Sequence, residues 1–530
     1  MSRAARSLIA PIFLLSSGAA AAHMMGVVYN LPIPFWMYAF AASGALALSF
    51  LMVGYFVTAQ SAARNFQTLD LGVPAPAICK AVLAGLRVLS VFALLLTILS
   101  GLFGPANPFA NFSMTFFWVV FALGFMYLTG LIGDVYAQIN PWRVMCDWIE
   151  RFNPGAFRPR VQYPRWLGYY PALAFYMAFI WLELFGQPPP RGLGAILIGY
   201  SVANVAAAAV FGADAWFRYG ELFAVFLRLI GKIAPFDYRI DPATGLPTAV
   251  RLRQPFIGLL QEPADHFSLL LFVLFMLSST AFDGLHETRP WVLVFWKGIY
   301  PHLASLVPGP YLVLVDFYYY WQWAMLFVSP FVYLAVYLLF VWMMKIVTGS
   351  GKAVRDLALQ FALTLIPIAF VYNITHYYTL LVSQGPMILS MISDPFGLGW
   401  DLFGTARTVR QPIILLADSV WHTQVGLILF GHIVSVYLAH VLALETFPRG
   451  RQGVVSQFPM LALMMLLTTV GLRILSLPIA AGQVQDPLPT GSAGAVVAMA
   501  DTRLAARGAA SALTGRSPWR GGTRGQARPR

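Results

Sequence analysis

About ten stretches of the sequence are apolar for roughly twenty residues or more, and this repetition decides what the chain can fold into. They cover residues 33–57, 82–103, 112–133, 167–186, 192–213, 264–282, 321–347, 357–382, 421–445 and 456–480. A helix of about 20 residues spans the hydrocarbon core of a bilayer, where the backbone must satisfy its own hydrogen bonds. The sequence therefore predicts an all-α membrane protein, a polytopic bundle of about ten transmembrane helices.

The composition agrees with a protein surrounded by lipid. Of the 530 residues, 59% are hydrophobic and only 10% are charged, which leaves more apolar surface than a water-soluble fold can bury. The formal net charge is +13, but the basic residues fall mainly in short segments between the apolar stretches, the pattern of topology signals. The expected partner is the lipid bilayer and not a nucleic acid.

The two ends of the chain differ from the rest. Residues 1–22 have the pattern of a signal peptide, with arginines, a short apolar core and a cleavage site of small residues; a short first transmembrane helix is the alternative. Cleavage makes His23 the first mature residue, whose α-amine and imidazole can chelate a metal ion. Residues 486–530 are rich in Gly, Ala and Arg and predict a disordered tail. The transmembrane domain is residues 23–485.

Loop charge predicts the orientation of the bundle. If the mature N-terminus is periplasmic, about eighteen Lys and Arg fall in cytoplasmic loops and about five in periplasmic ones. We therefore expect a multi-pass protein of a bacterial inner membrane with its mature N-terminus in the periplasm. Cys79 and Cys146 then lie on the reducing side and form no disulfide. Residues 221–235 alternate apolar and basic positions at helical spacing, which predicts an amphipathic helix on the cytoplasmic membrane surface.

Two long segments expected in the periplasm, 283–320 and 383–420, hold an unusual share of the few acids and histidines. Asp283 and His286 begin the first segment, at the mouth of the sixth apolar stretch. Nitrogen and oxygen donors of this kind suit a divalent metal ion if they converge. Ordinary hydrophilic loop residues are the alternative interpretation.

A second group of candidates lies at the periplasmic ends of the eighth and ninth apolar stretches. His376 lies three residues after Asn373, and His422 lies four residues after Asp418. At these spacings each pair shares one face of a helix. An Asp can hold the second ring nitrogen of a metal-binding His and so fix its tautomer. A helix-end hydrogen bond explains the same spacing without a metal.

His432 and His440 lie deeper in the ninth stretch. They are eight residues apart, about 80° around a helix, so both can face the bundle interior. Ionisable groups at that depth are costly and are functional candidates for that reason. A neutral histidine that donates a hydrogen bond to another helix is the alternative. The same two interpretations apply to Glu183 and Asn204.

Several motifs resemble those of a family of bacterial integral-membrane proteins, the fenitrothion hydrolases, which are membrane-bound organophosphate hydrolases. They are LPIPFWMYAF at 31–40, GDVYAQINPWR at 133–143, WLELF at 181–185, SSTAFDGL at 278–285, DPFGLGWDLFGT at 394–405 and GHIVSVYLAHVLAL at 431–444. The resemblance covers the chain except the signal peptide and the tail. The family also tends to have a histidine directly after its signal sequence, as His23 would be after the predicted cleavage.

The resemblance implies hydrolysis of an aryl phosphotriester or phosphorothioate triester, a small hydrophobic substrate. A bound divalent metal ion supplies both a hydroxide and a Lewis acid for such chemistry, and we expect its site at the periplasmic face. The residue roles are our own hypotheses from the positions of acids and histidines and are not carried over from the family. The candidate catalytic residues are Asp283 and Asp418, and the candidate metal ligands are His286, His376, His422 and His23.

Two other classes of function stay open. A transporter or metal-handling permease would use intramembrane histidines such as His432 and His440. A redox or assembly protein would hold haem or copper through the same two residues. The sequence also leaves open whether a second subunit or a homo-oligomer is needed. Turnover in detergent, uptake into sealed vesicles and a haem spectrum distinguish the three classes.

Overall fold

The computed structural model describes residues 34–56, 68–73, 75–241, 245–306, 311–409, 411–415, 417–447 and 451–477. The predicted signal peptide at 1–22, His23 and the predicted tail at 486–530 lie outside these residues. The predictions made for them stay predictions.

The described residues form helices where the sequence predicts spans. Nine helical runs in this part of the chain are long and apolar enough to cross a membrane: α2 (Phe35–Phe56), α4 (Pro76–Phe103), α5 to α6 (Phe112–Ile132), α10 (Pro190–Phe211), α13 (Phe267–His286), α16 (Tyr311–Thr348), α17 to α19 (Val354–Met391), α20 (Ala417–Thr446) and α22 (Gln457–Ser476). A tenth apolar helix, Tyr170–Gly186, is shorter. The prediction of an all-α polytopic bundle is confirmed.

Three of these runs change helical type along their length. Their segments are α5 (Phe112–Met114), η3 (Thr115–Phe125) and α6 (Met126–Ile132); α9 (Tyr170–Trp181) and η4 (Leu182–Gly186); and α17 (Val354–Phe361), η7 (Ala362–Leu365), α18 (Ile366–Gln384), η8 (Gly385–Met387) and α19 (Ile388–Met391). Both η3 and η4 are π-helical. Pro367 is the second residue of α18, a position that tolerates proline because the N–H there needs no helical partner.

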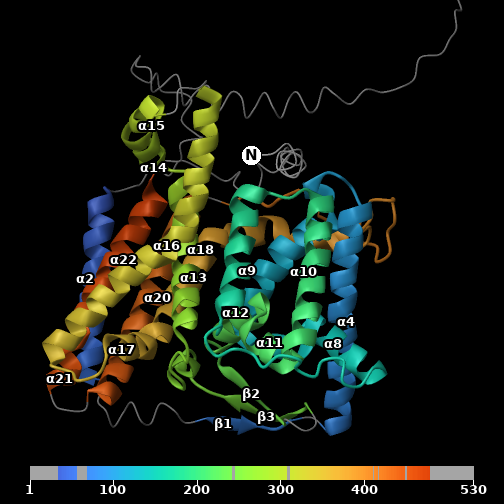
Figure 1. The fold of residues 1–530 in the computed structure, drawn as a ribbon, viewed down its shortest axis with the longest axis horizontal. Helices are drawn as coiled ribbons and strands as arrows, with labels where there is room; N and C mark the ends of the chain where they lie inside the picture. Colours follow the sequence, from blue (N-terminus) through green and yellow to red (C-terminus); the bar gives the residue numbers. More distant parts are fainter. Residues whose placement is uncertain are drawn as a thin grey trace, which may run out of the picture.

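Helix α13 lies at the centre of the bundle. It packs against α9, α16, α18 and α22, and most of its side chains are buried. On one side of it Figure 1 shows α2, α20 and α22, and on the other side α4, α9 and α10. Because α13 joins the two groups of helices, its polar residues are held inside protein and away from lipid.

A small sheet, which the sequence patterns did not predict, closes one end of the bundle (Figure 1). Strands β1 (Leu69–Leu71), β2 (Phe236–Ile240) and β3 (Pro247–Leu252) form an antiparallel sheet in the order β1-β3-β2. We call this the sheet end. Short helices in the described residues include η2 (Pro108–Ala110), α7 (Tyr136–Ile139), α8 (Pro141–Phe152), α11 (Ala213–Tyr219), η5 (Ile257–Leu260) and α21 (Arg451–Val455).

The prediction of a surface helix at 221–235 is wrong. Helix α12 (Leu222–Gly231) is buried inside the protein, where it packs against α6, α9 and α18. Its apolar residues lie on most of its circumference, and Leu222, Val225 and Ile230 are almost inaccessible to solvent. A short helix that is apolar on nearly all sides has to be covered by protein rather than by a membrane surface.

Oppositely charged residues hold the two ends of α12. At its N-terminus Glu221 is fully buried and accepts hydrogen bonds from the backbone N–H groups of Phe223, at 2.9 Å, and Ala224, at 2.6 Å. At its C-terminus the guanidinium of Arg253 donates to the carbonyls of Gly231 and Ala234, both at 3.0 Å. Each charge opposes the partial charge of the helix dipole at that end and satisfies backbone groups that a short helix leaves open.

The segment 283–320 is largely helical rather than an extended loop. Helix α13 continues to His286, so Asp283 belongs to the span itself. It is followed by α14 (Arg289–Leu293), η6 (Val294–Ile299) and α15 (Tyr300–Leu306). Aromatic contacts hold these helices to α16, including Trp291 stacked on Trp321 with ring centroids 4.6 Å apart. In 383–420, helices η8 and α19 are followed by irregular backbone at residues 392–409 and 411–415.

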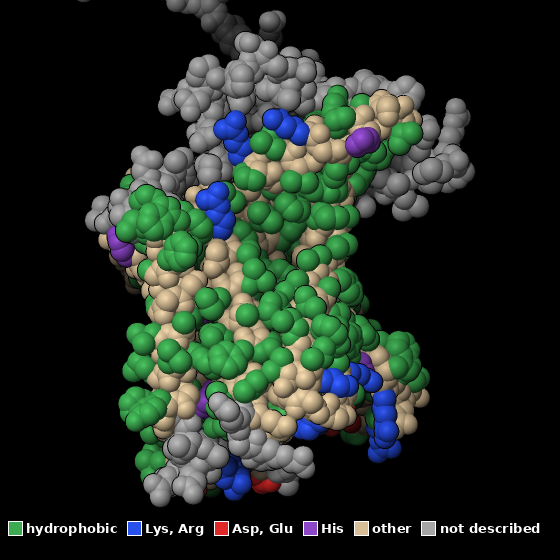
Figure 2. Space-filling view, turned by 90° about the vertical axis from the view of Figure 1, so that its left-hand side faces the viewer, with side chains coloured by type: hydrophobic (Ala, Val, Ile, Leu, Met, Phe, Trp, Pro, Cys, Tyr) green, Lys and Arg blue, Asp and Glu red, His purple; other side chains and the backbone are tan. Residues whose placement is uncertain are grey.

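The surface of the bundle is apolar where lipid would surround it. In Figure 2 hydrophobic side chains cover the middle of the face, and Lys and Arg lie nearer its two ends. Helix α2, at the left of Figure 1, illustrates this, since Phe40, Leu48, Leu51 and Tyr55 are each more than half exposed. Such a surface needs a lipid bilayer or detergent to cover it. The protein is therefore a multi-pass membrane protein.

The buried cap of α12 leads to a stability prediction. We expect Arg253→Met to destabilise the protein by about 2–4 kcal/mol, because it leaves carbonyls at the helix end and Asp237, its ion-pair partner at 3.4 Å, without a donor. Arg251→Met is the control, since its partner Asp70 is 67% exposed and such pairs contribute about 0–1 kcal/mol. Reversible denaturant unfolding in detergent measures both. Equal losses of stability would contradict the role assigned to Arg253.

Candidate functional site

Asp283 is the centre of a polar cluster inside the bundle. Its side chain is only 2% exposed, and its Oδ2 atom lies 2.6 Å from Nε2 of His376. The hydroxyl of Tyr377 donates a hydrogen bond to the same oxygen at 2.7 Å. Two consecutive residues of α18 thus bind one carboxylate of α13. The structure brings together two residues, Asp283 and His376, that the sequence patterns indicated separately.

Close packing sets the distance between α13 and its neighbours at this level. A Cβ atom added to Gly284 would lie 2.9 Å from Cγ2 of Ile474 and 4.0 Å from Cε1 of His376. A larger residue there would force the side chain of Ile474 on α22 to shift. On the other side of α18, Tyr127 donates a hydrogen bond to the carbonyl of Asn373 at 3.3 Å. These contacts fix α18 so that its polar face reaches Asp283.

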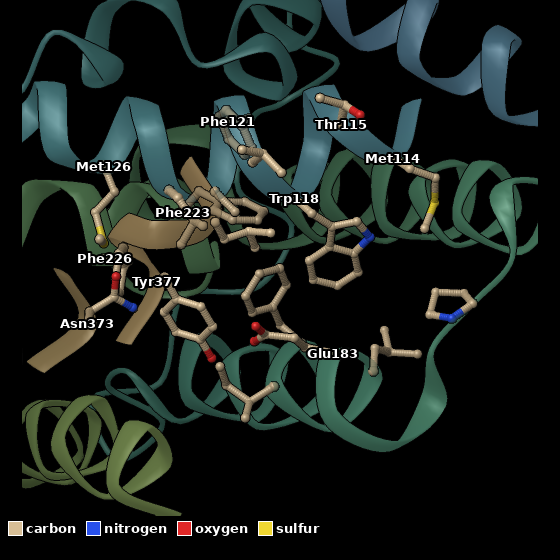
Figure 3. Close-up of a pocket in the computed structure, with 18 of the residues that line it drawn as sticks. Met114, Thr115, Trp118, Phe121, Met126, Glu183, Phe223, Phe226, Asn373 and Tyr377 are labelled. Atoms are coloured by element: carbon tan, nitrogen blue, oxygen red, sulfur yellow. The ribbon is translucent and has the colours of Figure 1, made fainter. Parts of the chain in front are cut away.

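A cavity of about 160 Å³ lies beside this cluster. Helices η3, α9, η4, α12 and α18 form its wall, and residues such as Pro108, Pro188 and Gln384, near the helix ends away from the sheet, form its rim. Its aromatic lining residues are Phe109, Trp118, Phe121, Tyr176, Phe179, Phe223, Phe226 and Tyr377. Figure 3 shows Tyr377 and Glu183 projecting from different helices into the same space. A cavity of this composition suits a small apolar molecule.

Glu183 links the cavity to the polar cluster. It lines the cavity, lies within hydrogen-bonding reach of Tyr377 and interacts electrostatically with Asp283 and His376. The hydroxyl of Tyr377 donates to Asp283. Its oxygen can accept a hydrogen bond from Glu183 when Glu183 is protonated, whereas an ionised Glu183 competes with Asp283 for the single hydroxyl proton. We call Glu183, Tyr377, Asp283 and His376 the acid–base cluster. It extends from the cavity to an imidazole side chain that is 21% exposed.

The backbone around the cavity is irregular. The π-helices η3 and η4 contribute Trp118, Phe121 and Glu183 to its wall, and π-helical turns are rare and frequent at functional sites. At the rim, Gln187 has a φ angle of 37°, a left-handed conformation that is unusual for a residue with a side chain. Strain of this kind persists only where the surrounding structure enforces it.

The other described histidines that were predicted as metal ligands do not converge with His376 on the carboxylate of Asp283. The ring of His286 is buried between Phe185 and Phe282, and its Nδ1 lies 2.8 Å from the carbonyl oxygen of Asp283. The side chain of His422 is exposed on α20. Asp418 lies one turn earlier in the same helix, at a position whose side chain is not described, and His23 is outside the described residues.

His432 and His440 are both buried on α20, and each has a hydrogen-bond partner. Nδ1 of His432 lies 2.8 Å from the carbonyl oxygen of Ile428, and the ring packs against Tyr372. Nδ1 of His440 lies 2.6 Å from Oε1 of Gln457. The first bond is within one helix, and the second joins α20 to α22. This arrangement favours the interpretation of His440 as an interhelical contact.

The expected divalent metal site is not assembled in the described part of the chain. Among these residues, no group of three or more His, Cys, Asp and Glu is placed to hold a metal ion. The Asp283 oxygen and the His376 nitrogen that face each other are hydrogen-bonded together. These donors fit an ion pair better than a metal site, and we assign no chemical step to a metal.

The sequence patterns predicted neither the cavity nor the role of Tyr377. Tyrosine is common in membrane helices, so its position beside His376 gave no signal. Glu183 stands out in the sequence as an acid within an apolar span. From the sequence alone, however, a structural hydrogen bond between helices explains its presence as well as a functional role does. Its role depends on α12, which forms the floor of the cavity with Leu222, Phe223 and Phe226 and which the sequence assigned to the membrane surface.

No family model, curated protein or solved structure matches this chain in the comparisons made with known proteins.

The short contact between Asp283 and His376 predicts energetic coupling. In a double-mutant cycle of Asp283→Asn and His376→Ala, we expect a coupling free energy of about 1 kcal/mol or more, above the average of about 0.6 kcal/mol for polar contacts in membranes. Asp283→Asn combined with His422→Ala should be additive within about 0.5 kcal/mol, since the His422 side chain is exposed. Unfolding in mixed micelles measures both cycles. Additivity in the first cycle would rule out the contact as a determinant of stability.

Proposed function

We propose that the protein is a membrane-embedded hydrolase of small apolar esters, with aryl phosphotriesters as the substrate class. The observation that carries the proposal is a carboxyl group, Glu183, in the wall of an aromatic cavity, connected through Tyr377 to the pair of buried Asp283 and partly exposed His376. General acid–base catalysis needs such a group within reach of the reacting atoms and a path for its proton.

The cavity limits what can bind. Its volume of about 160 Å³ is close to the roughly 150 Å³ of an apolar cavity known to hold one benzene molecule. One aromatic ring therefore fits among the lining side chains. The dialkyl phosphoryl part of a triester would lie toward the rim at Gln187 and Pro188. In this position the phosphorus comes near Glu183 while the ring stays in apolar surroundings.

Glu183 would exchange a proton with the reacting molecules twice. In its ionised form, Glu183 takes a proton from a water molecule as the water oxygen bonds to phosphorus. The bond between phosphorus and the aryl oxygen then breaks, and Glu183 returns the proton to that oxygen. The products are a phenol and a phosphodiester acid, so atoms and charge balance without a further reactant. This use of one group as base and then acid is common in hydrolases that avoid free hydroxide.

Asp283 and His376 would act as positioning residues. Asp283 binds the hydroxyl of Tyr377 and so orients the phenol ring that faces Glu183. His376 supplies the charge that compensates Asp283 when its imidazole is protonated. A buried carboxylate without such partners is costly, so loss of His376 would disturb Tyr377 and Glu183 as well. This assignment moves Asp283 from the catalytic role expected from sequence to a supporting one.

The resemblance to organophosphate hydrolases supports the substrate class. Glu183 lies in WLELF and Asp283 in SSTAFDGL, two of the motifs on which the resemblance rests. The two motifs are about 100 residues apart in the sequence, and in the structure their acids belong to the same cluster. Two of the motifs therefore contain the acids that lie together in the acid–base cluster.

A transporter of the same kind of molecule is the second candidate. The observation that favours it is the chain of protonatable groups from the cavity to the partly exposed His376, since such chains carry protons in membrane transporters. An enzyme turns over in detergent, where no second compartment exists. A transporter needs a sealed vesicle and leaves the molecule unchanged.

Substitution of Glu183 tests the proposal. In detergent, the purified protein should release nitrophenol from an aryl phosphotriester, and Glu183→Gln should lower the rate about 100-fold or more, because general acid–base catalysis contributes about 10²- to 10⁴-fold. His376→Ala should lower it about 10-fold. Glu262→Gln, a change at a carboxylate that is 81% exposed, is the control. Wild-type rates in Glu183→Gln, with protein level verified, would contradict the proposed chemistry.

A further inference from the structure

We propose that the cavity also binds small lipophilic organic cations, such as a quaternary ammonium attached to one aromatic ring. The proposal uses the cavity of the proposed function but not its hydrolytic step. Three features carry it: the charge of the lining residues, the aromatic wall and the size of the space. The lining charge and the aromatic rings favour a positive ligand, and the aromatic wall and the volume favour a small apolar one.

The lining residues provide one acid and no base. Glu183 is the ionisable acid among them, and no Lys, Arg or His is part of the described lining. Outside the lining, His376 is a basic residue that acts on Glu183 electrostatically, but its Nε2 lies 2.6 Å from Oδ2 of Asp283 and pairs with that carboxylate. Among the described residues that form the wall, there is therefore no basic side chain to pair with an ionised Glu183. A carboxylate in apolar surroundings is costly without a counter-charge, and a bound cation provides one.

Aromatic rings surround the space that Glu183 faces. Trp118 and Phe179 pack together in the wall with ring centroids 5.3 Å apart, and Phe223 lies 5.8 Å from Phe179. Figure 3 shows Trp118, Phe223 and Tyr377 on the same space as the Glu183 carboxylate. The faces of such rings attract cations, by about 2 kcal/mol or more once the cation has lost its water. Rings together with a carboxylate are the setting in which quaternary ammonium groups are recognised.

The same charge distribution disfavours anions. A phenolate or phosphodiester anion would meet Glu183 without a basic residue to offset it, and like charges repel strongly where water is excluded. Size adds a second limit, since about 160 Å³ accepts one ring with a small substituent. The expected order of affinity for molecules of equal shape is therefore cation, then neutral molecule, then anion.

A cation and a proton compete for Glu183. The groups that face it are Tyr176 of its own helix, Asp283 of α13, and His376 and Tyr377 of α18; η3 and α12 contribute no ionisable side chain to the cavity lining. A permanently charged ligand should therefore bind more weakly as the pH falls and Glu183 holds its proton. A neutral molecule of the same shape should not share this dependence.

Binding to the full-length protein in detergent tests the inference. The probe is tritiated benzyltrimethylammonium, measured by scintillation proximity. Its competitors are neopentylbenzene, which has carbon in place of nitrogen, and benzenesulfonate, an anion. We expect the unlabelled cation to compete at least 10-fold better than neopentylbenzene in the wild type and benzenesulfonate to compete least. This comparison needs no variant, so it stands even where a substitution impairs folding.

Glu183→Gln isolates the charge. This variant keeps the shape of the side chain, and we expect it to bind the cation at least 10-fold more weakly while its affinity for neopentylbenzene changes less than 2-fold. Glu262→Gln removes a distant, exposed carboxylate and should behave as wild type. Equal affinity of the cation for wild type and Glu183→Gln, better competition by neopentylbenzene than by the cation, or no saturable binding would each overturn the inference.

The two proposals fail separately. Cation binding that depends on Glu183 without triester hydrolysis would remove the hydrolase and keep the cation site. Hydrolysis that depends on Glu183, together with no preference for the cation, would remove the cation site and keep the hydrolase.

Discussion

The hydrogen bonds to Asp283 are the contact on which the rest of the site depends. A carboxylate in the middle of a membrane-embedded bundle has to be compensated, and His376 and Tyr377 both bind its Oδ2 atom. These bonds join α13 to α18 and orient Tyr377 toward the cavity. Glu183 then faces an aromatic space with its nearest polar neighbour already fixed. Stability and chemistry therefore share the same few atoms.

A second electrostatic arrangement makes the cavity possible. Helix α12 is short, buried and apolar on most sides, and it forms the floor of the cavity. Glu221 at its N-terminus and Arg253 at its C-terminus satisfy its backbone and oppose its dipole. Both caps come from segments that lie outside the long spans. The caps thus hold α12, the floor of the cavity, in place. The ends of η4 and α18 that lie away from the sheet end form the rim of the cavity.

The sequence was sufficient for the spans, because about twenty apolar residues admit few structures in lipid. It could not place α12, since the alternation of apolar and basic residues at 221–235 fits a surface helix as well as a buried one. The sequence singled out Asp283 and His376, but it grouped them with His286 and His422. In the structure, the His286 ring bonds to a backbone carbonyl, and the side chain of His422 is exposed. Which polar residues meet depends on how α9, α13 and α18 pack, and no local pattern records that. The pairing of Tyr377 with Asp283 is an example.

The central claim is that the acid–base cluster works as one unit in catalysis. A double-mutant cycle on the rate of triester hydrolysis, with Glu183→Gln, His376→Ala and the combined variant, measures this most directly. Residues that act together are non-additive, so the double variant should be no slower than Glu183→Gln alone within about 3-fold. If instead the rate of the double variant falls by the product of the two single losses, His376 acts independently of Glu183. That result would contradict the claim that the cluster is one unit.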